Sequence, residues 1–124
     1  MTPFSLTRDI NGFNGFGLSF SDTKYSATIA QSTDTTLTIG AASVDGMVSS
    51  FATNRYLVIF NFEPGSQVWV ANGATAAVPA GATFASTTSE LNPAARVVQA
   101  GDVLHFITPD SGGAAVSVVI YALL

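Results

Sequence analysis

The stretch Arg55–Ala71, RYLVIFNF-EPGS-QVWVA, decides the fold that this sequence predicts. Two runs of apolar, β-branched and aromatic residues flank four turn-forming residues, which is typical of a strand–turn–strand unit. In Glu63–Ser66, proline at the second position fixes a negative φ and glycine at the third tolerates a positive φ, so the pattern favours a type II turn. A type II turn matches the twist of a tight hairpin poorly. We therefore expect this unit to form a corner between two sheets.

Shorter strand patterns surround this unit on both sides. Apolar and hydroxyl residues alternate in Lys24–Gln31 and Thr35–Ala41, as half-buried strands require, and Ala114–Leu124 is apolar on both faces, as a central strand requires. Further strands are predicted at Ala95–Gln99 and Val103–Thr108, with an edge strand at Ala82–Thr87 and a short strand or a bridge at Met47–Phe51. Turns are predicted at Ser32–Asp34, Asp45–Gly46, Pro79–Gly81, Ala100–Asp102 and Pro109–Gly113. No amphipathic helical pattern occurs. The sequence predicts an all-β, jelly-roll-like β-sandwich or barrel of about eight short antiparallel strands.

The composition excludes several classes of partner. The chain has 124 residues, of which 48% are hydrophobic and only 10% charged, and its net charge is −4. Its four basic residues, Arg8, Lys24, Arg55 and Arg96, are scattered singly, whereas nucleic acids and anionic membranes bind clustered cations. Without cysteine the chain has no disulfides, and we expect no secretory leader and no membrane helix. So little charge predicts a hydroxyl-covered surface combined with surfaces buried against partners.

Residues 1–23 differ from the domain predicted for residues 24–124. Four phenylalanines, Phe4, Phe13, Phe16 and Phe20, lie among glycines and asparagines. The spacing of Phe13, Phe16 and Phe20 would suit one face of a helix, but each interior glycine costs a helix about 1 kcal/mol. We expect an extended arm whose rings dock into grooves, either on its own domain or on a neighbour, since each buried phenylalanine contributes about 1.5–3 kcal/mol.

The region Asn72–Pro93 carries the weakest pattern of the chain and is rich in alanine, glycine, threonine and serine. Asn92 and Pro93 suit the start of one helical turn, with asparagine as the cap and proline in the first position. Loops of this kind carry specificity in binding proteins.

Residues for catalysis are few and poorly patterned. His105 is the only histidine, and alternation places it on one face with Val103 and Ile107, with Asp102 three residues before it. One histidine makes no metal cluster, and the chain has no nucleophile elbow, phosphate loop or calcium-loop motif. The expected roles are a packed or interfacial histidine and solvated glutamates, with no catalytic residue, no metal and no cofactor.

Trp69 offers a large rigid surface for a sugar or a protein partner. It alternates with Val68 and Val70, so one of the two sets faces the core. If the valines point inward, Trp69 lies outside and must be covered; if Trp69 points inward, it is the largest core residue.

The run from Gln67 to Asp102, with the strands that follow it, resembles small structural proteins from the virion genes of tailed bacteriophages. The residues that carry this resemblance are Val68-Trp69-Val70, Pro79–Phe84 (PAGATF), Ser89–Pro93 (SELNP), Val98–Asp102 (VQAGD) and Tyr121-Ala122. They cover about the C-terminal half of the chain, and residues 1–23 carry no such motif.

The resemblance implies a head decoration, or cement, protein on the capsid exterior. Such a protein is made in the host cytoplasm, binds the outer surface of major capsid subunits, and is often a trimer with an arm that reaches a neighbour. The alternative is a carbohydrate- or receptor-binding module of a phage fibre or tail, which predicts an exposed Trp69 or a tyrosine near the loop 72–92. A third hypothesis is that the protein is an enzyme, which requires His105 to share one cleft with either Asp102 or Glu63. Under the first two readings the partner-binding residues are Phe4, Phe13, Phe16, Phe20 and Trp69.

Overall fold

A computed structural model of the chain describes residues 2–8, 10–17, 20–39, 42–43, 52–53, 55–79 and 88–123. The regular elements of these residues are all strands, as the sequence predicts. They are β1 Ser5–Arg8, β2 Asn14–Gly17, β3 Lys24–Ile29, β4 Thr35–Thr38, β5 Ala42–Ser43, β6 Ala52–Thr53, β7 Arg55–Phe62, β8 Trp69–Asn72, β9 Glu90–Leu91, β10 Ala95–Gln99, β11 Val103–Ile107 and β12 Ala114–Leu123. Among the described residues there is no helix with the length and hydropathy to cross a membrane.

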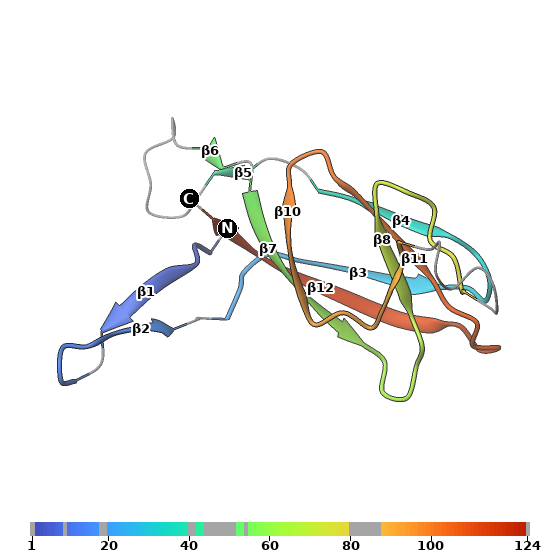
Figure 1. Cartoon of the computed structure of the whole chain (residues 1–124), viewed down its shortest axis with the longest axis horizontal. Helices are drawn as coiled ribbons and strands as arrows, with labels where there is room; N and C mark the ends of the chain where they lie inside the picture. The colour runs from blue at the N-terminus through green and yellow to red at the C-terminus, as the bar shows by residue number, and fades with distance from the viewer. Residues whose placement is uncertain are drawn as a thin grey trace.

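Eight of these strands form two four-stranded antiparallel sheets (Figure 1). Their orders are β10-β7-β12-β3 and β4-β11-β8-β9. The pairing is nested: β3 pairs with β12, β4 with β11, β7 with β10, and β8 with β9. Two further pairings, β7 with β12 and β8 with β11, join these pairs into sheets. The prediction of about eight antiparallel strands is thereby confirmed, and they form a two-layer sandwich.

The corner predicted between Arg55 and Ala71 is confirmed. β7 belongs to one sheet and β8 to the other, so the chain changes sheets within this stretch. Gly65 has φ +78°, and the amide of Ser66 donates to the carbonyl of Glu63 at 3.0 Å, as a turn with a left-handed third residue requires. Asn92, which follows β9, fastens this corner to the edge of the sheet that contains β8, because its Oδ1 accepts from the amide of Val68 at 2.8 Å.

The hydrogen bond between Asn92 and the amide of Val68 explains why the predicted helical turn at Asn92 and Pro93 is wrong. Asn92 has φ +43°, a left-handed conformation that a first helical turn does not contain. Its amide group also donates to the carbonyl of Ser66 at 3.0 Å. The side chain therefore satisfies backbone groups of a distant segment, where the sequence suggested that it caps its own.

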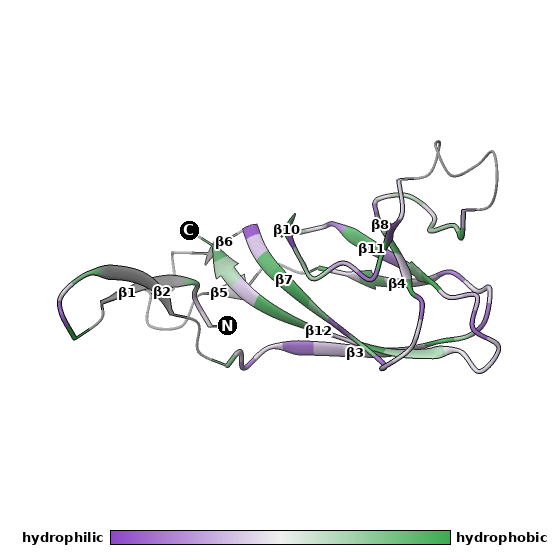
Figure 2. Cartoon of the chain, turned by 60° about the horizontal axis from the view of Figure 1, so that its bottom comes forward, coloured by the Kyte–Doolittle hydropathy of each residue, from purple (hydrophilic) through white to green (hydrophobic). Residues whose placement is uncertain are grey.

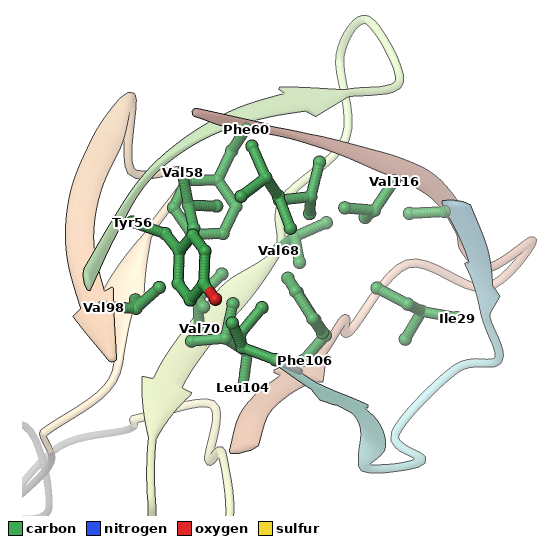
Figure 3. Close-up of a cluster of buried hydrophobic side chains, with 14 residues drawn as sticks. Ile29, Tyr56, Val58, Phe60, Val68, Val70, Val98, Leu104, Phe106 and Val116 are labelled. Carbon is green, nitrogen blue, oxygen red and sulfur yellow. The ribbon is translucent and has the colours of Figure 1, made fainter. Parts of the chain in front are cut away.

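The inward faces of the two sheets form one apolar core (Figure 3). Tyr56, Val58 and Phe60 of β7 face Leu104 and Phe106 of β11 across the gap between the sheets. The rings of Phe60 and Phe106 meet edge to face with centroids 6.3 Å apart, a geometry that adds about 0.5–1.5 kcal/mol to their burial. The core is thus built from the alternating apolar positions that the sequence marks.

β12 occupies the centre of its sheet, between β7 and β3, which confirms the prediction drawn from its apolar faces. Its inward residues Val116, Val118 and Ile120 are buried in the core. Figure 2 shows hydrophobic colour along β7 and β12 and hydrophilic colour at the start of β3, where Lys24 lies.

The N-terminal residues are tied to the end of β12 and then leave the sandwich. Phe4 donates its amide to the carbonyl of Ala122, and Ala122 donates to the carbonyl of Thr2, both at 2.9 Å. β1 and β2 then pair with each other as a short hairpin. Figures 1 and 2 both draw this hairpin projecting beyond the two four-stranded sheets. The docking role expected for residues 1–23 stays a prediction.

Three predicted elements fall on residues outside the described ranges: the turn Asp45–Gly46, the short strand or bridge Met47–Phe51 and the edge strand Ala82–Thr87. The predicted turn Pro79–Gly81 is described only at Pro79.

Candidate functional site

The outer face of the β10-β7-β12-β3 sheet is apolar at one end. Ala95, Ile59 and Val119 lie opposite one another in adjacent strands, and Val97 lies opposite Leu57. Leu57, Ile59 and Val119 alternate along their strands with buried core residues, and Ala95 and Val97 are the pairing partners of Ile59 and Leu57, so all five point away from the core. Val97 is 56% exposed and the other four are half-buried. We name these five residues the apolar patch.

The other end of the same face is polar and hollowed. Asn61, Ser117 and Ser26 form one row across the strands, and their short side chains leave a shallow depression of about 620 Å³. Glu63 lies at its margin, where its Oε2 accepts the amide of Ala115 at 3.1 Å. One sheet face therefore carries an apolar half and a hydroxyl-rich half.

The four N-terminal phenylalanines occupy different environments. Phe4 is half-buried beside the end of β12, whereas Phe13 is 72% exposed and Phe20 is fully exposed. Phe16 lies in β2, where its backbone pairs with Leu6. Trp69 lies in β8, far from the hairpin (Figure 1), so the structure does not bring the five predicted partner-binding residues together.

The orientation of Trp69, which the sequence left open, is the outward one. Val68 and Val70 belong to the core cluster, and Trp69 points to the outer face of the β4-β11-β8-β9 sheet. Trp69 is nevertheless only 8% exposed. It is covered from outside, as that orientation requires, and it offers little surface to a sugar or a partner in this conformation.

His105 lies on the same outer face and is paired with a carboxylate. Its Nδ1 is 2.8 Å from Oδ2 of Asp34, and the other oxygen of Asp34 accepts the amide of Ala76 at 3.1 Å. Ser89 Oγ accepts the neighbouring amide of Ala77 at 3.1 Å. These bonds hold residues 76–77, in the loop after β8, across the outer face of this sheet. Sequence reasoning missed Asp34 because it precedes a separate strand, 71 positions from His105.

The carboxylates that the sequence suggested as partners of His105 bind other groups. Asp102 Oδ2 accepts from the amide of Gln99 at 2.8 Å and from Nδ2 of Asn72 at 3.1 Å, and Glu63 binds the amide of Ala115 as described above. In the part of the chain that is described, no group of three or more histidines and carboxylates is placed to hold a metal ion.

Glu90 and Arg96 form a two-pronged ion pair between the edge strands of the two sheets. Arg96 Nε is 2.8 Å from Glu90 Oε2, and Arg96 Nη2 is 3.0 Å from Glu90 Oε1. The hydrogen bond from the guanidinium lowers the pKa of Glu90, and the carboxylate raises the pKa of Arg96. Both side chains are about half exposed, so solvent screens much of the attraction.

No known protein family matches the chain, and no curated protein or solved structure matches it either.

Proposed function

We propose that the chain is a non-enzymatic virion structural protein that decorates a bacteriophage capsid. It binds the outer surface of major capsid subunits and stabilises the shell, so that it resides on the capsid exterior after synthesis in the host cytoplasm. The observation that carries the proposal is the apolar patch, and the sequence resemblance described above supplies the kind of partner.

The position of the patch is what makes it informative. In an antiparallel sandwich the outward positions are normally polar, because they face water. Here three adjacent strands present apolar side chains outward in register, and Val97 is more than half exposed. Contiguous apolar residues on an exposed face mark interaction sites. A broad sheet face suits docking on the wall of a shell.

The projecting hairpin supports assembly of several copies. Phe13 and Phe20 leave most of their ring surface uncovered within one chain. Burial of each ring against a neighbour would contribute about 1.5–3 kcal/mol. We assign this segment to contacts between copies in a homo-oligomer, with a trimer as the favoured state.

We also propose that the topology of this two-layer sandwich is that of a jelly roll. The nested pairing of β3 with β12, β4 with β11, β7 with β10, and β8 with β9 supports it. A long antiparallel hairpin rolled into two sheets has this order, and jelly rolls occur among viral capsid domains.

The patch is tested with Val97→Glu and a matched control on the polar half of the same face, Ser117→Glu. Each variant is incubated with capsid shells that lack the protein, from the phage whose genome encodes it, and the shells are sedimented. A glutamate at position 97 should abolish co-sedimentation, because a charge would be buried without a partner. Ser117→Glu should bind as the wild type does. Equal binding of Val97→Glu and the wild type would refute the role of the patch.

The hairpin is tested with the double variant Phe13→Ser/Phe20→Ser, which leaves the bonds between Thr2, Phe4 and Ala122 in place. Light scattering at two protein concentrations should give a smaller particle mass than the wild type. Deletion of residues 1–20 should also lower the mass while the sandwich stays folded. Leu91→Ser, at an apolar residue 45% exposed on the other sheet, is the control and should keep the wild-type mass. A wild type that is monomeric at both concentrations would contradict the assignment.

A further inference from the structure

A cavity of about 230 Å³ opens between the two sheets on the side where β9 and β10 are the edge strands. Four strands supply its apolar floor: Phe60 from β7, Val70 from β8, Val98 from β10 and Leu104 from β11. Figure 3 shows these four side chains converging from both sheets. The cavity is therefore a gap at the margin of the core. It adjoins the apolar patch at Val97, which also lines it, whereas the other four patch residues do not.

The mouth of the cavity is polar. Asn72, Thr88, Glu90 and Arg96 lie around it, and the two-pronged ion pair spans from the edge of one sheet to the edge of the other. Arg96 also donates through Nη1 to the carbonyl of Ala95 at 2.6 Å. The pair is thus fixed by three hydrogen bonds of Arg96, which gives the mouth a defined geometry.

The ion pair keeps unused hydrogen-bonding capacity. A carboxylate offers about four lone-pair sites and a guanidinium five N–H donors, so roughly two of each remain for another molecule. Acceptors and donors therefore stand side by side at the mouth. A hydroxyl group, which both donates and accepts, matches either partner.

The charges at the mouth select against an ionic ligand. A carboxylate ligand that approached Arg96 would also meet Glu90, and an ammonium ligand that approached Glu90 would meet Arg96. Displacing one member of the pair would leave the other charge without its partner. A neutral ligand with several hydroxyl groups incurs neither cost.

The volume limits the size of the ligand. Drug-sized ligands occupy pockets of about 300–1,000 Å³, and a water molecule takes about 30 Å³, so this cavity has room for about seven or eight waters. That volume suits one small ring. The apolar floor suits the C–H face of such a ring.

We propose that this cavity binds a single neutral sugar ring, with adjacent hydroxyls on Glu90 and Arg96 and the apolar face of the ring toward Phe60. The three proposed sugar contacts, Glu90, Arg96 and Phe60, lie outside the apolar patch, and the site needs no second copy; the two sites share only Val97, which lies at the border between them. A site this small and open predicts weak binding, with a dissociation constant on the order of 1–10 mM.

The test is a titration of the isotopically labelled wild-type protein with glucose, galactose, mannose and N-acetylglucosamine, followed by amide chemical shifts in NMR spectra. At least one sugar should give saturable shifts at Asn72, Glu90 and Arg96. Cyclohexanol, a ring with one hydroxyl, and benzoate, a ring with a charge, should bind at least tenfold more weakly. Failure of all four sugars to saturate, or tighter binding of benzoate, would overturn the proposal.

Two variants assign the binding to the ion pair. Glu90→Gln and Arg96→Lys each remove the two-pronged geometry at a half-exposed position and should weaken sugar binding at least tenfold. Glu63→Gln alters a carboxylate outside this cavity and should bind as the wild type does. Sugar binding that is unchanged in both Glu90→Gln and Arg96→Lys would refute the site.

One comparison separates this site from the proposed function. Phe13→Ser/Phe20→Ser should keep the sugar affinity even where it loses assembly. Loss of sugar binding in that variant would show that the site depends on assembly and would contradict the proposal that it needs no second copy.

Discussion

Gly113 gives the sharpest test of the sandwich geometry. It precedes β12, has φ +74°, and donates its amide to the carbonyl of Asp110 at 3.0 Å. A Cβ placed on Gly113 would lie 2.5 Å from the carbonyl oxygen of Ile29, at the end of β3. Ile29 is fully buried and pairs with Ala114, so this backbone cannot move without disturbing the β3–β12 pairing.

The expected loss of stability in Gly113→Ala has three contributions. The left-handed backbone costs an alanine about 1–2 kcal/mol. The contact with the Ile29 carbonyl adds about 1–3 kcal/mol, as overpacking of a rigid site does. The reduced freedom of the unfolded chain returns about 0.4–1 kcal/mol. The net destabilisation is therefore about 1–5 kcal/mol, with a central value of about 3 kcal/mol.

Two other glycines separate these contributions. Gly101 has φ +91° but open space where a Cβ would lie, so Gly101→Ala should carry the backbone cost alone, a net loss of about 1 kcal/mol. Gly112 has neither a left-handed φ nor a close neighbour, so Gly112→Ala should be neutral or slightly stabilising.

Urea unfolding, followed by the fluorescence of the single tryptophan, measures the series at one protein concentration. With a slope of about 1–3 kcal/mol per molar urea, Gly113→Ala should lower the midpoint by roughly 1–2 M. The expected order of midpoints, from highest to lowest, is Gly112→Ala, then Gly101→Ala, then Gly113→Ala. Equal midpoints for Gly113→Ala and Gly112→Ala would refute the close approach of β3 to this turn.

Three further predictions concern polar groups. Thr108→Val should lower the free energy of unfolding by about 1–3 kcal/mol, because the fully buried hydroxyl donates to the carbonyl of Gln67 at 2.7 Å. Thermal or urea unfolding measures this loss, and the control Thr38→Val, at an exposed site, should stay within about 0.5 kcal/mol of the wild type. Asp34→Ala should speed hydrogen exchange at the amide of Ala76 while Asp34→Asn, which keeps an acceptor, should not; identical exchange in both variants would contradict the loop anchor. The pKa of Glu90 is lowered on folding, so its contribution to stability is present above its unfolded pKa and is lost as the pH falls through the folded value. The difference in stability between the wild type and Glu90→Gln should therefore shrink as the pH falls. A difference that grows as the pH falls would show that folding raises the pKa of Glu90.

Much of the fold could be predicted because it depends on local pattern. The corner at Glu63–Ser66 follows from proline and glycine at fixed turn positions, and the central place of β12 follows from apolar residues on both of its faces. The outward orientation of Trp69 was one of two alternatives, since alternation fixes which residues share a face and leaves open which face is buried.

The candidate sites depend on contacts between distant segments, and local pattern does not encode those. Asp34 reaches His105 because β4 pairs with β11, and Glu90 reaches Arg96 because β9 and β10 are edges of opposite sheets. The error at Asn92 has the same origin: the residue type suits a helix cap, but its side chain finds the amide of Val68. The apolar patch was in principle visible as the second apolar face of β7 and β12.

The nested order of the strands has a consequence for how the chain folds during synthesis. The innermost pairs close over short distances along the chain, whereas β3 must wait for β12, which a ribosome makes after the other strands of the sandwich. Contacts between residues far apart in sequence slow folding. Until β12 arrives, β7 and β3 lack the strand that lies between them, and their open edges can pair with other chains. The yield of folded protein should therefore depend on how soon β12 is synthesised after β3, and a chaperone that shields these edges should raise the yield.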